Sequence, residues 1–382
     1  MNDESEKEKP YYCTECKRVH TKGEIYKDHL KFMLKEVPQL NLETMENEIF
    51  DDSLDEINEL EELNDSSERM KKVKFQLEDI PGMSKQLLNK LKKARLTFED
   101  IVYLSPLQIQ EYFHLDEEIL YRLIYSAMDL MKMGFQKADK IMSEYISPNK
   151  LTSGSQELDD LLGGGFVPGE VYEFYGEFRT GKTQLAHQLC INVQLPIQEG
   201  GLNSKALYID SEGSFCPKRI IEMAEGRSLN YEQALENIYI ARAYNSDHQI
   251  LVTRESNSII SDGDVKLLIL DNIICHFRSE YINRRDASLR QQLLATHLYD
   301  LKSIAKRYKI IVIFTNQVTT VPDVFYGNPL KAAGGNIVAH AATNRIYLRK
   351  GNGIERIAKI VNSPYLPEGE ARFSITEKGI SD

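Results

Sequence analysis

The sequence has no long apolar run and few cysteines. No stretch of its 382 residues is long and apolar enough to cross a bilayer as a helix, so we expect no membrane partner. The polar, acidic first ten residues do not have the apolar core of a signal peptide. The five cysteines are an odd number, and we expect Cys190, Cys216 and Cys275 in core-like surroundings. These absences favour a reducing, cytoplasmic location over a secreted, disulfide-linked protein.

The acidic residues are unevenly distributed. The formal net charge is −11, and residues 43–69 alone hold twelve acidic side chains against one base, Arg69, which accounts for the whole imbalance. The rest of the chain is neutral on balance and can carry basic surfaces, so the net charge does not exclude DNA as a partner. We interpret the acidic segment as a solvated linker, although its apolar residues could form one stripe of a helix.

A chain of this length suggests two or three domains. We expect a cysteine- and histidine-containing unit in residues 1–40, an acidic linker in 41–72, a helical domain in 73–132, a connector in 133–150 and a larger core in 151–382. Within the helical domain, helices are predicted over Gln86–Ala94 and Pro106–Phe113, joined by a short Phe98–Leu104 run.

In the larger core, apolar strand-like runs alternate with helical stretches. This alternation predicts an α/β fold, in which a mostly parallel sheet is covered by helices. No internal repeat is found. The predicted strands are Val171–Tyr175, Ala206–Asp210, Val265–Asp271, Ile310–Thr315 and Arg345–Leu348.

Residues 176–183 read Gly-Glu-Phe-Arg-Thr-Gly-Lys-Thr, between the first predicted strand and a helix-like segment. This pattern predicts a phosphate-binding loop, because glycines let backbone N–H groups close around an anion. Lys182 would reach the outer phosphates, and the Thr183 hydroxyl would hold Mg²⁺. A glycine-containing turn ahead of a helix is the simpler alternative, but the full pattern in this context argues against it. We therefore expect ATP or GTP, with Mg²⁺.

Polar residues follow three of the predicted strands. The buried run Leu267–Leu270 ends in Asp271, which we expect to support the metal, although any buried strand can end in a polar residue. Glu212 follows the strand that ends at Asp210, and could take a proton from an attacking water unless it is only a solvated loop acid. Gln317 follows a third strand, where an amide can hydrogen-bond the γ-phosphate and report its presence.

Six stretches occur in an order that is specific to one family of proteins. Over residues 73–382 they give a close resemblance to RecA/RadA-type recombinases, with the archaeal RadA proteins as the nearest likeness. The stretches are Leu151-Thr-Ser-Gly-Ser-x-x-Leu-Asp-x-Leu-Leu-Gly-Gly-Gly165, Gly176-Glu-x-x-x-Gly-Lys-Thr-Gln184, Tyr208-Ile-Asp-Ser-Glu-Gly-Ser-Phe215, His276-Phe-Arg-Ser-Glu-Tyr-Ile282, Thr315-Asn-Gln-Val318 and Leu366-Pro-Glu-Gly-Glu-Ala371.

The resemblance implies a RecA-like P-loop ATPase core in an ATP-dependent DNA strand-exchange protein that works as a helical filament. Glu212 would activate water and Arg219 would stack on adenine. Gln317 with His340 would sense the γ-phosphate from the DNA side, and the 364–367 segment, with Pro367, would cap the neighbouring subunit's nucleotide. The nucleotide contacts carried over from the motif are Gly176, Glu177, Phe178, Arg179, Thr180, Gly181, Lys182, Thr183 and Gln184.

Two loops leave the nucleotide edge of the predicted sheet and could contact DNA. Strand exchange needs phosphate contacts that ignore sequence, and apolar groups that separate bases. A solvated helix face is the alternative for the arginines. The candidate residues are Arg278, Arg284, Arg285 and Arg290 in a poorly structured stretch after Asp271, and Val321, Pro322, Phe325 and Lys331 in the loop after Gln317.

Two features of the N-terminal half also match the resemblance. The helices around Ile80-Pro-Gly-Met83 resemble a helix-hairpin-helix, whose turn would grip phosphate, with lysines such as Lys85 and Lys90 nearby. Phe135-x-x-Ala138 lies where the family has its polymerisation motif, in which the Phe fills a pocket of the neighbour and the connector adds a strand to the neighbour's sheet.

Several residues depart from the family pattern. Arg179-Thr180 replaces a small Gly-Ser pair, Asn272 stands where Ser or Thr usually follows the metal acid, and Asn283-Arg-Arg285 replaces Gly-Arg-Gly. Asn362 replaces an aspartate that helps hold a monovalent cation in relatives, so we expect no strong potassium dependence.

The set Cys13, Cys16, His20 and His29 is an addition to the family pattern. Two thiolates and two imidazoles suit tetrahedral Zn²⁺, and a unit of about forty residues has too small a core to fold without such a staple. The alternative is a tail with incidental cysteines. The sequence therefore predicts a structural Zn²⁺ site, which could recruit a partner or touch DNA.

Two functional hypotheses follow. The first is an active recombinase, a DNA-dependent ATPase that assembles on single-stranded DNA, pairs it with a homologous duplex and is associated with the nucleoid. The second is a paralogue that uses ATP only as a switch, mediates the work of a true recombinase and does not exchange strands. The helical domain, the Phe135 connector and both DNA loops favour the first. Expected partners are single- and double-stranded DNA, further copies of the chain in a helical filament or ring, and recombination mediators.

Overall fold

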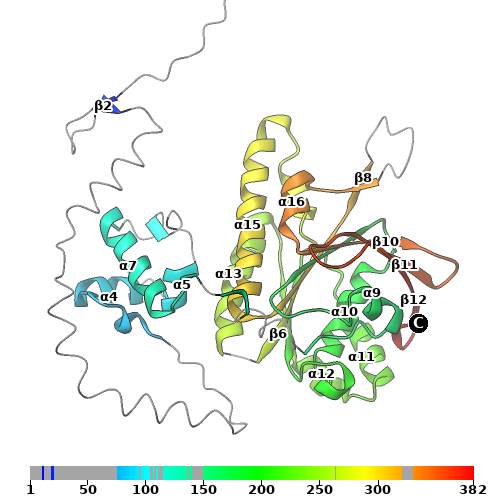
Figure 1. Cartoon of the computed structure of the whole chain (residues 1–382). Coiled ribbons are helices and arrows are strands. Elements are labelled where there is room, and N and C mark those ends of the chain that lie inside the picture. The colour runs from blue at the N-terminus through cyan, green and yellow to red at the C-terminus, as the bar shows by residue number, and fades with distance from the viewer. Residues whose placement is uncertain are drawn as a thin grey trace, which may run out of the picture. The chain divides into compact units, whose positions relative to one another are not determined.

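The computed structural model divides the chain between residues 74 and 75 into two units (Figure 1). In the first unit, strand β1 (Tyr11–Tyr12) pairs antiparallel with β2 (Val19–His20). The predicted zinc ligands Cys13, Cys16 and His29 lie outside the described residues, and so does the acidic linker. The described residues are 11–12, 19–20, 75–93, 96–103, 106, 109–110, 115–135, 137–139, 149–262, 264–320 and 330–382.

The second unit begins with helices that share a small apolar core, in which Leu91, Ile101 and Leu120 are fully or almost fully buried. One prediction here was wrong, because the run expected to join two helices is itself helical. Thr97 and Asp100 cap that helix reciprocally, each accepting a hydrogen bond from the other's backbone N–H. The elements are η1 (Leu77–Asp79), α4 (Lys85–Lys93), α5 (Phe98–Tyr103) and α7 (Glu117–Leu130).

The larger core is built on a nine-stranded sheet with the order β13-β12-β11-β10-β3-β7-β6-β4-β5. The six strands from β10 to β5 are parallel to their neighbours, whereas β11, β12 and β13 pair antiparallel. The strands are β3 (Val171–Gly176), β4 (Lys205–Asp210), β5 (Ile238–Arg242), β6 (Val265–Asp271), β7 (Ile311–Asn316), β10 (Asn344–Lys350), β11 (Glu355–Asn362), β12 (Glu370–Thr376) and β13 (Gly379–Ser381).

All five predicted strands are present, with ends that differ by at most two residues. The predicted mostly parallel sheet is correct for its centre. The sequence reading missed β5 and the three antiparallel strands, because their apolar residues alternate with polar ones or form shorter runs. Alternation suits these strands, since each leaves part of its surface exposed at one side of the sheet.

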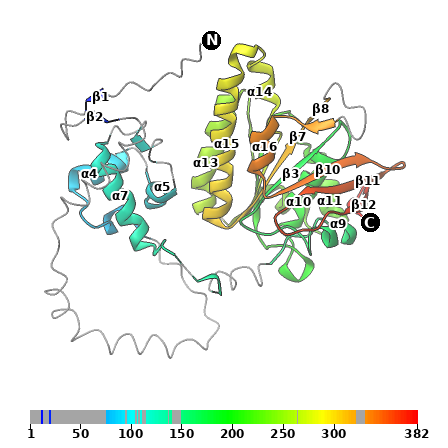
Figure 2. The same ribbon diagram turned by 45° about the horizontal axis from the view of Figure 1, so that its top comes forward.

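Helices cover both faces of the sheet (Figures 1 and 2). Each group packs on its own apolar cluster, one centred on α10 and the other on α15. Within the residues described, no helix has the length and apolar character needed to span a membrane. One face carries α9 (Gln156–Leu161), α10 (Lys182–Asn192), α11 (Pro217–Gly226) and α12 (Tyr231–Glu236); the other carries α13 (Ser246–Asp262), α14 (Cys275–Glu280), α15 (Ala287–Tyr308) and α16 (Gly335–Ala341).

The cysteine environments differ from one another. Cys190 is fully buried in α10, and burial raises the pKa of its thiol. Cys275 is half-buried at the start of α14. Cys216 is exposed, so the prediction of a core-like setting was wrong for this residue. It directly precedes Pro217 at the start of α11, where the chain turns at the surface.

A buried polar pair links α13 to α15. Gln249 and His297 are both fully buried, and the Gln249 Nε2 atom lies 3.1 Å from the His297 Nε2 atom. Gln249 also donates to the Ile273 carbonyl at 3.2 Å. Burial lowers the pKa of His297 to about 3, because an imidazolium would lose its hydration there. The folded protein therefore holds this ring neutral.

This burial predicts a loss of stability in acid. The pKa of His297 is lower in the folded state than its ordinary value of about 6.5, so the unfolded chain takes up the proton first as the pH falls. Each pH unit below about 6.5 should cost about 1.4 kcal/mol of unfolding free energy from this group. Urea unfolding at pH 7 and pH 5 should show that the wild type loses about 2 kcal/mol more than His297→Gln. Equal losses in the two proteins would contradict a buried neutral imidazole.

Candidate nucleotide site and DNA-facing segments

The predicted phosphate-binding loop joins the end of β3 to the start of α10. Gly181 has φ of +101° and begins the helix, and a Cβ on Gly176 would lie 2.2 Å from the Leu348 carbonyl oxygen. Lys182 folds over the loop and donates its Nζ to the carbonyls of Gly176 (3.0 Å) and Glu177 (2.9 Å). The loop thus brings a helix N-terminus and an ammonium group together, and this arrangement suits a phosphate chain.

Arg179 takes a left-handed backbone conformation, with φ of +64°. Glycine adopts this conformation without strain, which gives a physical reason for the small residue that the family pattern has at this position. The Arg179 guanidinium lies over the exposed ring of Phe178, 5.4 Å from its centroid. The two side chains therefore add a cation and an aromatic surface to the outside of the loop.

Asp271 lies at the end of β6 and is 1% exposed. Its carboxylate accepts hydrogen bonds from Thr183 Oγ1 (2.7 Å) and Tyr208 Oη (2.9 Å). Ser214 Oγ at 3.2 Å and Thr315 Oγ1 complete the set of hydroxyl donors. A buried carboxylate held by hydroxyl groups beside Thr183 is a suitable donor set for a hard cation such as Mg²⁺.

Burial affects the charges around this carboxylate. It lowers the pKa of Lys182, and the negative charges of Asp271 and Glu212 partly offset the effect. It also raises the pKa of Tyr208 well above its usual range, with Asp271 adding to the shift. The phenol therefore remains a hydrogen-bond donor to Asp271. Phosphates bound in the loop would favour the protonated form of Lys182 for the same electrostatic reason.

Glu212 lies beyond the end of β4 and is held by two amides. Gln317 Nε2 donates to its Oε1 at 2.8 Å, and Asn272 Nδ2 donates to the same oxygen. Partial burial raises the pKa of Glu212, the hydrogen bond from Gln317 lowers it, and the charge of Asp271 raises it. A carboxylate with a raised pKa at the rim of the site suits proton transfer from water.

Gln317 also connects this carboxylate to the first segment predicted to contact DNA, because Arg278 Nη1 donates to Gln317 Oε1 at 3.3 Å. The segment is more ordered than predicted. Arg278 lies on α14, Arg285 is exposed in η3 (Arg284–Asp286), and Arg290 lies in the first turns of the 22-residue α15. The expectation of a poorly structured stretch was therefore wrong, since helices carry these residues.

The second segment predicted to contact DNA leaves the sheet through a two-stranded ribbon. Strands β8 (Val318–Thr320) and β9 (Leu330–Ala332) pair antiparallel, and Lys331 on β9 is exposed. Asn316 donates to the Ala333 carbonyl at 2.9 Å, which fixes the base of the ribbon beside Gln317. The candidate tip residues Val321, Pro322 and Phe325 lie outside the described residues.

Gln184 directly follows the phosphate loop in α10, and Arg219 Nε donates to its Oε1 atom at 2.7 Å. Arg219 also donates to the carbonyls of Thr376 and Glu377, so it ties α11 to the β12–β13 turn. His340 is exposed near the end of α16.

The segment containing Pro367 lies at the opposite edge of the sheet from the phosphate loop. It follows β11, whose end pairs with the start of β10. Glu170, which is almost fully buried just before β3, accepts hydrogen bonds from Tyr365 Oη (2.6 Å) and Asn344 Nδ2 (2.7 Å). These contacts anchor the segment and leave Pro367 itself exposed.

Phe135 and Ala138 are both exposed, and Phe135 shows no burial at all among the described residues, at 112% relative exposure.

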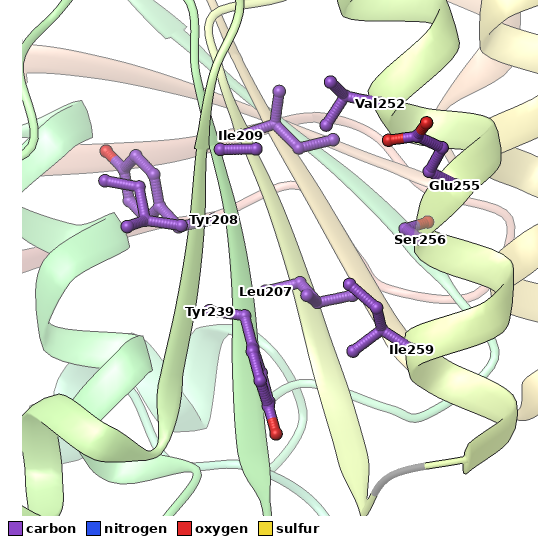
Figure 3. Close-up of a pocket in the computed structure, with 10 residues that line it drawn as sticks. Leu207, Tyr208, Ile209, Tyr239, Val252, Glu255, Ser256 and Ile259 are labelled. Carbon is purple, nitrogen blue, oxygen red and sulfur yellow. The ribbon is translucent and has the colours of Figure 1, made fainter.

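An apolar pocket of about 90 Å³ lies between α13 and the sheet edge formed by β4 and β5. Figure 3 shows Val252, Ser256 and Ile259 on the helix, facing the strand residues Leu207 and Ile209. Because β5 ends the sheet, a segment beside this pocket could also pair with its free edge.

Sequence reasoning missed several groups around the two carboxylates. Tyr208, Ser214 and Thr315 donate to Asp271, and Asn272 donates to Glu212. Tyr208 and Thr315 lie near the carboxyl ends of β4 and β7. Ser214 and Asn272 lie just beyond the ends of β4 and β6. Neighbouring parallel strands bring these ends together, so a search for polar residues at every strand end could have found them.

The sequence model of the Rad51 family matches residues 146–382. This range contains the phosphate loop, both carboxylates, the arginine-bearing helices and the β8–β9 ribbon. It covers more than half of the chain, and the mixed α/β sheet agrees with a RecA-like core. The chain belongs to the Rad51 family of DNA-dependent ATPases, which form filaments on DNA and serve recombination and repair.

Proposed function

We propose that this protein is an ATP-dependent DNA strand-exchange recombinase that assembles on single-stranded DNA, as a protein of the archaeal RadA type would. One observation carries the proposal: Glu212, Gln317 and Arg278 form a continuous line of hydrogen bonds. This line begins at the candidate hydrolytic carboxylate and ends on the first DNA-facing segment. A change at the nucleotide can therefore alter DNA contacts directly.

In this proposal the chain's own residues divide the work of hydrolysis. The 176–181 loop and Lys182 bind and orient the phosphates, and Glu212 takes a proton from the attacking water. Thr183 and Asp271 would hold Mg²⁺, which neutralises phosphate charge when bound. Arg219 and Gln184 would lie beside the base, where the guanidinium would have to turn from its carbonyl partners to stack on adenine.

Gln317 and His340 would report the γ-phosphate to the DNA side. Gln317 is suited to this role because its amide already bridges Glu212 and Arg278 and stands at the base of the β8–β9 ribbon. Arg278 and Lys331 would then contact DNA phosphates, together with Arg284, Arg285 and Arg290. Val321, Pro322 and Phe325 would meet the bases.

The helical domain would add a second phosphate contact. Gly82 has φ of +78° in the turn before α4, and the Met83 N–H donates to the Ile80 carbonyl at 3.2 Å. This turn and the exposed Lys85 and Lys90 support a helix-hairpin-helix contact to duplex DNA.

We infer head-to-tail assembly from the two edges of the sheet. The phosphate loop lies at the carboxyl ends of the parallel strands, and the anchored 363–367 segment lies at their amino ends. Translation of one copy along the next would therefore bring Pro367 over the neighbour's nucleotide. Phe135 of each copy would enter the neighbour's α13–β5 pocket, and the connector would pair with β5. A heterologous contact of this kind gives a filament unless it closes into a ring.

The second candidate function is an ATP-switched mediator without strand exchange. Asn283-Arg-Arg285 and Arg179 favour it, because both add bulk and charge where the family pattern has small residues. Strand-exchange assays separate the two functions: a mediator would bind DNA with ATP but would not pair it with a homologous duplex. For either function we propose a cytoplasmic, nucleoid-associated protein with recombination mediators among its partners.

Lys182→Ala should abolish ATP turnover, by roughly 100-fold or more, because the loop loses its only ammonium toward the outer phosphates. Strand exchange should be lost with it, while thermal unfolding stays close to that of the wild type. Lys302→Ala, an exposed lysine on α15, is the matched control and should behave as wild type. Full strand exchange by Lys182→Ala would refute the phosphate-loop assignment.

Phe135→Glu should leave monomers in light scattering and electron microscopy, because a carboxylate cannot enter an apolar pocket without losing its hydration. Tyr125→Glu, which changes an exposed aromatic on α7, should still assemble. Ile259→Arg should block the pocket and also give monomers. A mixture of Phe135→Glu and Ile259→Arg should form dimers, since one intact Phe and one intact pocket remain. Filaments of Phe135→Glu alone would exclude the connector's role.

We also propose a structural Zn²⁺ site formed by Cys13, Cys16, His20 and His29. The β1–β2 pair supports it, because the two cysteines lie in the sequence between these strands. Elemental analysis of the full chain should find about one zinc per chain. Cys13→Ser with Cys16→Ser should remove it, whereas Cys216→Ser, at an exposed cysteine, should not. A wild-type chain that folds without zinc would end this proposal.

A further inference from the structure

Asn272 occupies an unusual position in the site. It directly follows Asp271, is 1% exposed, and stands where the family pattern has Ser or Thr. Its side chain uses both ends of its amide. The Oδ1 atom accepts from the N–H groups of Ile274 (3.0 Å) and Cys275 (2.8 Å), and the Nδ2 atom donates to Glu212 Oε1.

The backbone of Asn272 is also fixed. Its N–H donates to Ser211 Oγ at 2.7 Å, and the same hydroxyl donates to the Asn272 carbonyl at 2.6 Å. Ser211 immediately precedes Glu212, so two separate contacts join this residue to the segment that carries the carboxylate. The Asn272 amide cannot turn without breaking bonds to α14 as well as to Glu212.

We propose that Asn272 is a positioning residue for ATP hydrolysis, which holds the Glu212 carboxylate by Oε1 and joins it to the start of α14. This inference rests on the proposed function, in which Glu212 takes a proton from water. Asn272 does not touch the reacting atoms in this scheme. It acts through Glu212, and through α14 it couples the carboxylate to Arg278.

The chemistry of the side chain explains why asparagine suits this role. A carboxamide presents a donor and an acceptor on opposite sides of one planar group, so it can bind a carboxylate and two backbone N–H groups together. A serine hydroxyl at position 272 can also donate and accept, but its single oxygen lies closer to the backbone than the two ends of the carboxamide. It could not satisfy Glu212 while accepting from the backbone of α14.

Asn272 and Gln317 bind the same carboxylate oxygen, Oε1 of Glu212. Oε2 is then the oxygen available to take a proton from water. If Gln317 turns toward a γ-phosphate, as the proposed function requires, Asn272 retains Glu212 in place. The fixed amide thus keeps the carboxylate oriented while the other amide moves.

Asn272→Asp provides the sharpest test, because the new carboxylate keeps the acceptor for the N–H groups of Ile274 and Cys275 but replaces the donor to Glu212. We expect kcat of ATP hydrolysis with single-stranded DNA to fall by about tenfold, as part of the effect of a general base is lost. The Kd of a fluorescent ATP analogue should change by less than about twofold. The melting temperature should fall, because the new carboxylate faces the Glu212 carboxylate in a buried site. Asn272→Ser, the residue of the family pattern, should also lower kcat.

The role of Glu212 is isolated by a double-mutant cycle. In a Glu212→Gln background, Asn272→Asp should leave the residual rate unchanged, because no carboxylate base remains to be positioned. Asn352→Asp, an exposed asparagine in the β10–β11 turn, is the control for added charge and should not alter kcat.

Each outcome has a defined meaning. Wild-type kcat in both Asn272→Asp and Asn272→Ser would overturn the positioning role while leaving the proposed ATPase intact. A further drop caused by Asn272→Asp in the Glu212→Gln background would also overturn it, since the effect would then not pass through Glu212. Lack of turnover by the wild type with DNA would instead refute the proposed function itself.

Discussion

The buried carboxylate of Asp271 is the constraint on which the rest of the site depends. A charged group that is 1% exposed must be matched by donors, and here hydroxyl groups from α10, β4 and β7 supply them. Satisfying Asp271 therefore fixes the mutual positions of the phosphate loop and three strand ends. Glu212, Asn272 and Gln317 follow directly after those ends, so their placement depends on the same hydrogen bonds.

Different functional groups lie at the carboxyl ends of the parallel strands, at their amino ends and along the free edge of β5. The carboxyl edge of the sheet carries the phosphate loop, the candidate base and the two segments proposed to contact DNA. The opposite edge holds the 363–367 segment through Glu170 and Tyr365. The free edge of β5 carries an apolar pocket. In the proposed filament these surfaces of neighbouring copies would meet, which would couple the nucleotide, the neighbour and DNA.

The arginines predicted to contact DNA after Asp271 lie on helices, which bears on the proposed coupling between nucleotide and DNA. Arg278 lies on α14, whose first turn is held by the Asn272 side chain, so its position is tied to the nucleotide site through a short rigid element. A flexible loop would lose this link, because its side chains would sample many positions. The β8–β9 ribbon serves the second segment in the same way, since Asn316 fixes its base.

The sequence alone determined the phosphate loop, Asp271 and the central parallel strands, because each depends on local spacing: glycines before a lysine, or a buried run that ends in an acid. It did not reveal α5, where the capping hydrogen bonds between Thr97 and Asp100 start a helix in what reads as a short apolar run. It also did not reveal the edge strand β5 and the pocket beside it. The contact of Asn272 with Glu212 was also out of reach. Sixty residues separate the two in the chain, and only the parallel packing of β4 beside β6 brings them together.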